Sequence, residues 1–270
     1  MSDLSSIRRL TLVGGGNMGG AMLDGWLERG LPGANVEVVD PGPTPERRAR
    51  WEAAGVDIVP APGQDAPDVM VLSVKPQIVE DTIEATRESV EPRTVVVSVI
   101  AGVKLETLRS AYGLEARCVR AMPNTPAQIG RGVTVCCPTV EVADADRRRV
   151  ELLMSAIGAV EWIEDEKLMD AVTGVSGSGP AYVFHLAEAL AAAGEEAGLP
   201  RALAARLAAA TVSGAGELMH RSHDTPEALR RAVTSPNGTT QAGLDVLMPE
   251  LGDLMRRTVA AAAKRSRELG

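Results

Sequence analysis

A short glycine-rich turn near the start of the chain limits the folds that it can adopt. The apolar run Leu10–Val13 has the composition of a buried strand, and Gly14-Gly15-Gly16-Asn17-Met18-Gly19 follows it directly. Met22 and Trp26 then recur at helical spacing. A glycine turn that joins a strand to a helix is typical of the first βα unit of a parallel sheet.

The G-x-G-x-x-G pattern of this turn predicts a dinucleotide site. Gly14 permits the tight turn, Gly16 lets the backbone approach a pyrophosphate, and Gly19 lets the helix pack closely on the strand. The pyrophosphate is held at the N-terminus of the helix. The alternative is a turn without a ligand, but the position between Val13 and a helix favours binding. We therefore expect NAD(H) or NADP(H) as cofactor.

The first half of the chain alternates strand-like runs with amphipathic segments. The runs that we expect to be strands cover residues 7–13, 36–40, 69–74, 94–99, 117–121 and 132–136. Such alternation implies a mostly parallel sheet with helices on both faces. Strand-like runs end near residues 161–166, and long Ala/Leu helices follow. The fold class predicted is an α/β Rossmann-type N-terminal domain, residues 1–163, followed by an all-α C-terminal domain, residues 164–270.

The helical half has few bulky side chains. Leu203, Leu207, Ala210, Gly214 and Leu218 trace one apolar face, and the last helix, which includes Leu247 and Leu251, carries another. A helical domain built so largely of alanine and glycine buries only a thin core by itself. We therefore expect it to be a dimerisation domain in a homodimer.

Composition narrows the class of protein further. Aromatic residues are only 2% of the chain, so the core should be aliphatic, and the net charge of -8 argues against a nucleic-acid partner. Cys118, Cys136 and Cys137 lack the spacing of a metal site and are expected to be free buried thiols in a reducing compartment. No apolar run at the N-terminus resembles a secretory signal, and no segment is long and uncharged enough to span a membrane. We expect a cytoplasmic protein without metal, nucleic-acid or membrane partners.

Asp40 ends the second predicted strand, about 20 residues beyond Gly19, where an acidic side chain accepts hydrogen bonds from the adenine-ribose hydroxyls of NAD. Its charge would repel the 2′-phosphate of NADP. Arg47 and Arg48 follow on the next helix and could reach that phosphate, whereas Asp40-Pro41-Gly42 also has the composition of an ordinary turn. These residues are therefore compatible with either NADH or NADPH.

Later strands end in loops that should line the same crevice. These are Ser73-Val74-Lys75-Pro76, Val99-Ile100-Ala101 and the proline-flanked Asn124. The prolines on either side of Asn124 and Thr125 restrict the backbone, which suits contacts to a nicotinamide ring. Each loop alone could be a plain connection, but three at successive strand ends favour a cofactor site.

Two hydroxyl-rich loops, residues 173–180 and 234–240, are expected to run into helix N-termini in the second half. Free backbone N–H groups and the helix dipole favour a carboxylate or phosphate there. The alternative for either loop is simple capping of the helix.

Over its whole length, the chain resembles the pyrroline-5-carboxylate reductase family. The resemblance rests on Val74-Lys75-Pro76-Gln77, Arg120-Ala121-Met122-Pro123-Asn124-Thr125-Pro126, Ser176-Gly177-Ser178-Gly179-Pro180-Ala181-Tyr182 and the Ser-Pro-x-Gly-x-Thr motif that begins at Ser235. It implies reduction of a cyclic imino acid, 1-pyrroline-5-carboxylate, to L-proline by NAD(P)H. It also implies intertwined dimers, often assembled into a decamer of five dimers.

Carried over by position, the resemblance implies that residues 13–18, 73–76 and 99–101 contact the cofactor. It implies that Glu166, Thr239 and Thr240 contact the substrate. Asn237 departs from the Gly of the common Ser-Pro-Gly-Gly motif, and Asp40 is acidic where many members have Ser or Arg. The second departure bears on NADPH preference.

For the chemistry, the backbone N–H groups of Asn237, Gly238, Thr239 and Thr240 are expected to hold the substrate carboxylate. The Thr240 hydroxyl is expected to bind the ring nitrogen and is the predicted catalytic group. His185, His220 and His223 are expected to be structural or surface residues.

Two other functions are compatible with the sequence. A β-hydroxyacid dehydrogenase also joins such a glycine turn to a helical domain, but it needs a helix lysine, and only Lys167 and Lys264 follow the boundary. The other is a non-catalytic module that senses NAD(P)H.

Overall fold

The computed structural model describes residues 4–63 and 65–269 and divides into two compact units. Of the described residues, those up to 177 and from 262 onward form the first unit, and residues 178–261 form the second. The chain therefore passes from one unit to the other within its last helix. The domain boundary predicted between residues 163 and 164 stays a prediction. Met1–Asp3, part of the segment tested above for a secretory signal, lie outside the described residues.

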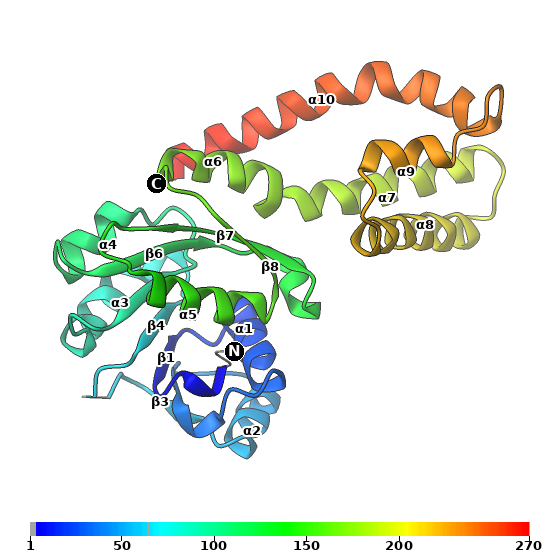
Figure 1. Cartoon of the computed structure of the whole chain (residues 1–270). Coiled ribbons are helices and arrows are strands. Elements are labelled where there is room, and N and C mark those ends of the chain that lie inside the picture. The colour runs from blue at the N-terminus through cyan, green and yellow to red at the C-terminus, as the bar shows by residue number, and fades with distance from the viewer. Residues whose placement is uncertain (1–3, 64, 270) are drawn as a thin grey trace. The chain divides into compact units, whose positions relative to one another are not determined.

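The first unit is built on one sheet in the order β3-β2-β1-β4-β5-β6-β7-β8 (Figure 1). All neighbouring strands are parallel except β6 and β7, which are antiparallel. The strands are β1 (Leu10–Val13), β2 (Val36–Val39), β3 (Asp57–Val59), β4 (Val69–Leu72), β5 (Val95–Ser98), β6 (Arg117–Met122), β7 (Gly132–Pro138) and β8 (Gly158–Trp162). The Rossmann-type prediction is confirmed. All six expected strands form, and β3 and β8 were missed.

Helices cover both faces of this sheet. They are α1 (Asn17–Glu28), α2 (Pro45–Ala53), α3 (Val79–Thr86), α4 (Leu105–Tyr112) and α5 (Asp144–Ser155). Side chains of α1, α2 and α5 join the hydrophobic cluster on one face, whereas α3 and α4 contribute to the cluster on the other. The strands supply alternate residues to the two clusters: Val71 belongs to the first, and Met70 and Leu72 belong to the second. Burial on both faces explains why these strands are continuous apolar runs.

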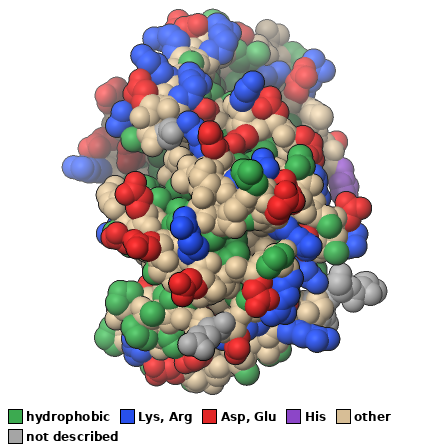
Figure 2. Space-filling view, turned by 90° about the vertical axis from the view of Figure 1, so that its left-hand side faces the viewer, with side chains coloured by type: hydrophobic (Ala, Val, Ile, Leu, Met, Phe, Trp, Pro, Cys, Tyr) green, Lys and Arg blue, Asp and Glu red, His purple; other side chains and the backbone are tan. Residues whose placement is uncertain are grey.

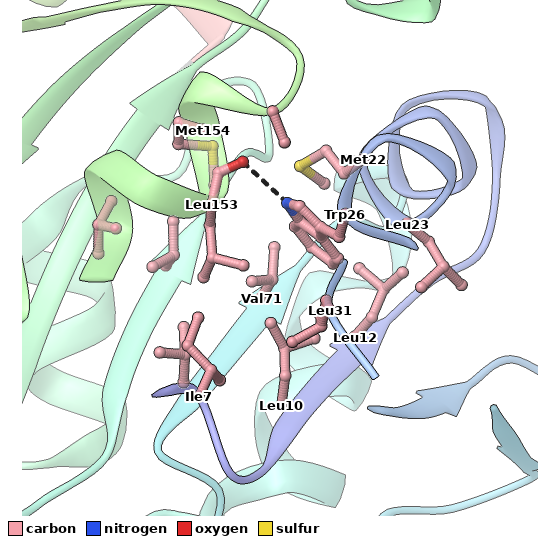
Figure 3. Close-up of a cluster of buried hydrophobic side chains, with 14 of the residues drawn as sticks. Ile7, Leu10, Leu12, Met22, Leu23, Trp26, Leu31, Val71, Leu153 and Met154 are labelled. Atoms are coloured by element: carbon pink, nitrogen blue, oxygen red, sulfur yellow. Dashed lines mark hydrogen bonds between the residues drawn. The ribbon is translucent and has the colours of Figure 1, made fainter. Parts of the chain in front are cut away.

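The core is aliphatic as expected, with two exceptions. Trp26 and Trp51 are fully buried in the cluster of α1, α2 and α5. The indole Nε1 of Trp26 donates a hydrogen bond of 2.9 Å to the carbonyl of Leu153 (Figure 3). Because α1 and α5 are far apart in sequence, this bond and the packing around it join an early and a late helix of the first unit.

The segment 173–180 is not the loop that the sequence suggested. A short helix, α6 (Met169–Val172), continues directly into a π-helical turn, Thr173–Gly177. Thr173 Oγ1 donates to Met169 O at 2.9 Å and Ser176 Oγ donates to Val172 O at 3.0 Å. These hydroxyls bind carbonyls one turn back, so a composition typical of a loop forms helix here.

The second unit consists of helices. They are α7 (Gly179–Glu196), α8 (Arg201–Arg221), α9 (Pro226–Ala232) and the first part of α10 (Thr239–Leu269), which contains Pro249. The buried residues of α8 are Ala204 and Ala208, and α7 and α9 contain none. The leucine face predicted on α8 is exposed within one chain, with Leu207 48% and Leu218 54% exposed. None of the described helices is long and apolar enough to cross a membrane.

Charged side chains of both signs are intermixed on the face drawn in Figure 2, with hydrophobic side chains between them.

One well-formed ion pair of the first unit joins Arg147 to both oxygens of Glu164, at 2.7 and 3.0 Å. Its hydrogen bonds lower the pKa of Glu164. Arg147 also lies over the Trp162 ring, 5.3 Å from its centroid, and so helps to cover the edge strand β8.

Replacing Trp26 by Phe should lower the free energy of unfolding by ~1–3 kcal/mol, because the buried Leu153 carbonyl loses its donor. Urea denaturation followed by circular dichroism measures the change. Trp162→Phe is the control, since Trp162 is only partly buried and its indole makes no comparable bond to the backbone among the described residues. Equal losses in the two variants would contradict the importance given to the Trp26 hydrogen bond.

Candidate functional site

The glycine turn lies where its backbone can approach a ligand. Gly14 has a φ of +95°, a left-handed conformation that favours glycine. A methyl group on Gly14 would lie 2.4 Å from Ser73 O, and one on Gly19 would lie 2.0 Å from Gly14 O. A methyl group on Gly16 would meet nothing within 4 Å. Gly14 and Gly19 are therefore required by the fold itself, whereas Gly16 is exposed and leaves space for a ligand.

The N-terminus of α1 opens onto this space. Gly16 caps the helix without a side-chain hydrogen bond, and Gly20 N is the amide that donates back to Gly16 O, at 2.8 Å. The amides of Asn17, Met18 and Gly19 belong to the first turn, whose N–H groups lack acceptors within the helix. Together with the positive end of the helix dipole, they fit a diphosphate.

Asp40 lies against the same turn. Its Oδ2 accepts a hydrogen bond of 2.6 Å from Gly15 N, and its Oδ1 accepts one of 2.8 Å from Gly42 N. Asp40 therefore has the turn role considered for it in the sequence, since it stabilises the Pro41-Gly42 turn. Its binding of the adenine ribose stays a prediction.

A hollow of about 280 Å³ opens at the carboxyl ends of the strands that precede Pro41 and Val74. The residues lining it are Val13, Val39, Pro41, Pro60, Ala61, Pro62, Val74, Ile78, Asp81, Thr82, Ala85 and Thr86. Its walls are mainly aliphatic and proline side chains, and its place beside the glycine turn fits an adenine ring. Sequence reasoning found Val13 and Val74 but missed the residues after β3 and on α3. Those residues form no motif by which the sequence could identify them.

The remaining cofactor segments lie at the carboxyl ends of parallel strands. Ser73-Val74-Lys75-Pro76 follows β4, and Val99-Ile100-Ala101 follows β5. Ser73 N donates to Val13 O at 2.8 Å, and Val99 N donates to Leu72 O at 3.0 Å, so these segments extend the pairing past the strands. The structure thus brings the predicted segments of the first unit to one edge of the sheet. Their contacts with a cofactor stay predictions.

Asn124 follows β6 at this edge, and its side chain has structural partners. Its Nδ2 donates to Ser176 O at 3.1 Å, and its Oδ1 accepts from Val133 N at 2.9 Å. The amide therefore ties the π-helical turn to β7. Binding of a nicotinamide by Asn124 stays a prediction and would add to this structural role.

Glu166 is held by two groups of the first unit. Its Oε1 accepts 2.9 Å and 2.8 Å hydrogen bonds from Leu105 N, at the start of α4, and from Arg120 Nη1. Arg120 is buried, with only 5% of its surface exposed. The pair neutralises a buried charge and caps α4, which is a structural explanation for Glu166 beside the predicted substrate contact.

In the second unit, the Ser-Pro-x-Gly-x-Thr motif forms the turn that starts α10. Asn237 has a φ of +60°, the left-handed region in which Asn is the most common residue after Gly. This explains why Asn can replace the first Gly of the motif. Gly238 N donates to Ser235 O at 3.0 Å. Thr239 and Thr240 are exposed in the first turn of a 31-residue helix, where free N–H groups fit a carboxylate.

Other reactive residue types are unsuited to catalysis. Cys118, Cys136 and Cys137 are buried free thiols, and burial raises the pKa of Cys136 to about 12. His185, His220 and His223 are exposed on the second unit, and His185 pairs with Glu188 at 3.1 Å. They form no part of the glycine turn or of the turn before α10.

Comparison with known proteins agrees with this geometry. A family model described as pyrroline-5-carboxylate reductase dimerisation matches residues 166–269, and one described as NADP oxidoreductase coenzyme F420-dependent matches residues 9–102. A pyrroline-5-carboxylate reductase from Pseudomonas aeruginosa is 38% identical over 268 residues, covering 98% of this chain and 97% of its own. The enzyme of that name from Pisum sativum is 40% identical over 271 residues, with the same coverage.

The chain belongs to the pyrroline-5-carboxylate reductase family. A solved structure of a pyrroline-5-carboxylate reductase from Coxiella burnetii has a TM-score of 0.91 and 31% identity, and the match covers 98% of this chain and 99% of that one. A Plasmodium falciparum pyrroline carboxylate reductase, solved with NADP bound, has a TM-score of 0.79 and 26% identity, with the same coverage. The family consists of NAD(P)H-dependent oxidoreductases that act on a C=N bond, so the cofactor of this chain is NADH or NADPH. Binding of that cofactor at the glycine turn stays a prediction.

Two glycine variants should separate the needs of the ligand from those of the fold. Gly16→Ala should keep the wild-type melting temperature and bind NADH and NADPH ~10- to 100-fold more weakly, because the methyl group enters the space for the diphosphate. Gly19→Ala should lower the melting temperature, because its methyl group meets Gly14 O. Thermal denaturation and fluorescence titration measure both effects. Unchanged nucleotide affinity in Gly16→Ala would exclude the diphosphate from this position.

Proposed function

We propose that the protein reduces 1-pyrroline-5-carboxylate to L-proline with NADH or NADPH, the last step of proline biosynthesis. The observation that carries the proposal is full-length similarity to pyrroline-5-carboxylate reductases. Family membership argues against the β-hydroxyacid dehydrogenase alternative. A non-catalytic sensor is distinguished by assay: oxidation of NADH and NADPH with and without 1-pyrroline-5-carboxylate.

The substrate is a small cyclic imine with one carboxylate. The backbone N–H groups of Asn237, Thr239 and Thr240 hold that carboxylate at the start of α10, where the helix dipole favours a negative charge. The N–H group of Gly238, also expected to do so, instead donates to Ser235 O within the turn. The Thr240 hydroxyl hydrogen-bonds the ring nitrogen and so fixes the orientation of the C=N bond. NADH or NADPH, when bound, would supply the hydride that reduces the imine carbon. A protonated imine is the better acceptor, since the product amine then develops without a negative charge.

Orientation rather than acid–base chemistry is the task of this chain. No histidine is needed, and Lys75 acts through its backbone at the start of the turn after β4. Glu166 contacts the substrate in addition to accepting hydrogen bonds from Arg120 and from the backbone N–H of Leu105.

We also propose that the helical unit pairs two copies of the chain into a homodimer, and that five dimers form a decamer. Within one chain, bulky apolar side chains of the helical unit are exposed, among them Phe184 at 63%, Val246 at 74% and Met248 at 52%. An exposed apolar surface of this kind requires a cover. A second copy is the cover that the match to a dimerisation model supports. Free cysteines support a cytoplasmic location.

Replacing Thr240 by Ala should lower kcat/KM for 1-pyrroline-5-carboxylate by ~10- to 100-fold, the effect of one hydrogen bond to a charged or charging group. Steady-state oxidation of the reduced cofactor measures it. Thr258→Ala is the matched control on the same helix, because the Thr258 hydroxyl donates to Leu254 O at 2.9 Å, one turn back. Wild-type kinetics in Thr240→Ala would remove Thr240 from the mechanism.

A charge on the exposed apolar face should dissociate the dimer. Phe184→Glu, on α7, is expected to shift the mass measured by light scattering from a dimer or its multiple toward the monomer. Leu114→Glu is the control, because Leu114 is 70% exposed on the first unit and outside the helical faces. A monomeric wild type at micromolar concentration would refute the dimer.

A further inference from the structure

The choice between NADH and NADPH is decided by charges at the adenosine end of the cofactor site. Asp40 stands beside the aliphatic hollow, and the next residue, Pro41, lines it. The charged side chain among the lining residues of the hollow is Asp81, and neither Lys nor Arg is among these residues. An adenosine bound here therefore has two carboxylates nearby.

The Asp40 carboxylate is fixed in position and still able to accept. Gly15 N and Gly42 N each occupy one of its oxygens, at 2.6 and 2.8 Å. A carboxylate offers about four lone-pair positions, so two remain for other donors. The two hydroxyls of an adenine ribose are donors of that kind, whereas a 2′-phosphate offers only acceptors and negative charge.

The arginines of α2 that could neutralise such a phosphate are bound elsewhere. Arg47 Nη1 donates to Gly15 O at 3.2 Å and to Gly16 O at 3.0 Å. Arg48 pairs with Glu52 one turn along the same helix, at 3.3 Å. Arg50 pairs with Asp24 on α1. Arg47 thus donates to carbonyls of the glycine turn and stabilises that turn whichever nucleotide is bound.

We propose that Asp40 makes this protein selective for NADH. Its carboxylate accepts the ribose hydroxyls and repels the 2′-phosphate of NADPH, while Arg47 stays on the glycine turn. The proposal rests on the nicotinamide dinucleotide site of the proposed function but not on the identity of the imine.

Direct binding tests the proposal without turnover. Titration calorimetry of the full-length wild type with NADH and with NADPH should give a dissociation constant at least ~10-fold lower for NADH, equivalent to about 1.4 kcal/mol. The ratio of the NADPH dissociation constant to the NADH dissociation constant should fall as the salt concentration is raised, because repulsion between exposed charges is screened. Equal binding, tighter binding of NADPH, or binding of neither nucleotide overturns the proposal.

Substitutions then assign the selectivity to Asp40. Asp40→Asn keeps the size and one acceptor oxygen, and Asp40→Ser removes the carboxylate. Both substitutions should bring the dissociation constants of NADPH and NADH closer together, because NADPH then binds more tightly. Asp57→Asn is the control: it makes the same charge change on an exposed residue at the opposite end of the parallel strand β3. An unchanged ratio in both Asp40 variants overturns the assignment.

Arg47→Ala tests the competing assignment. Because Arg47 binds the glycine turn, its loss should weaken NADH and NADPH binding alike. Selective loss of NADPH binding would show that Arg47 reaches the 2′-phosphate and would overturn the proposal. If NADH binds selectively but 1-pyrroline-5-carboxylate is not reduced, the selectivity stands and the proposed reaction fails.

Discussion

The close contact between Gly14 and Gly19 determines the geometry of the cofactor site. With no room for a methyl group between Gly19 and Gly14 O, α1 begins directly against the end of β1. The strand order places β1 between β2 and β4, at the point where the chain changes direction across the sheet. The helix N-terminus, the Asp40 carboxylate and the Ser73 segment meet there because each packs on the same turn. A larger residue at Gly19 would move α1 and separate them.

The two units acquire stability in different ways. The first buries two aliphatic clusters, one on each face of its sheet, and adds the hydrogen bond from Trp26 on α1 to Leu153 on α5. The second buries little more than Ala204 and Ala208, and its larger apolar side chains are exposed within a single chain. Its alanine and glycine content suits helices that approach closely, but those contacts bury little area. Association and stability of the helical unit are therefore expected to be coupled, in contrast to the first unit.

The sequence predicted the elements with strong local signals. Strands buried on both faces are apolar runs, and the spacing of glycines in the turn predicts a dinucleotide site. β3 and β8 were missed because Asp57–Val59 is only three residues long and Gly158–Trp162 is only partly buried. The π-helical turn was missed because its hydroxyls donate to carbonyls one turn back, which composition does not reveal. The lining of the hollow was predicted only in part, because Pro60, Ile78 and Thr82 come from separate segments and form no motif.

The scarcity of aromatic residues bears on how the nucleotide is recognised. The walls of the hollow include Pro41, Pro60 and Pro62, whose fixed φ angles make a rigid surface without aromatic stacking. Such walls select the shape and polarity of a base but offer few directional contacts to it. Directional recognition then moves to the neighbouring ribose, where Asp40 is held by two backbone amides. If the base contributes little discrimination, as we propose, the Asp40 carboxylate has a large influence on which dinucleotide binds. The composition and the proposed selectivity for NADH thus have a common physical origin.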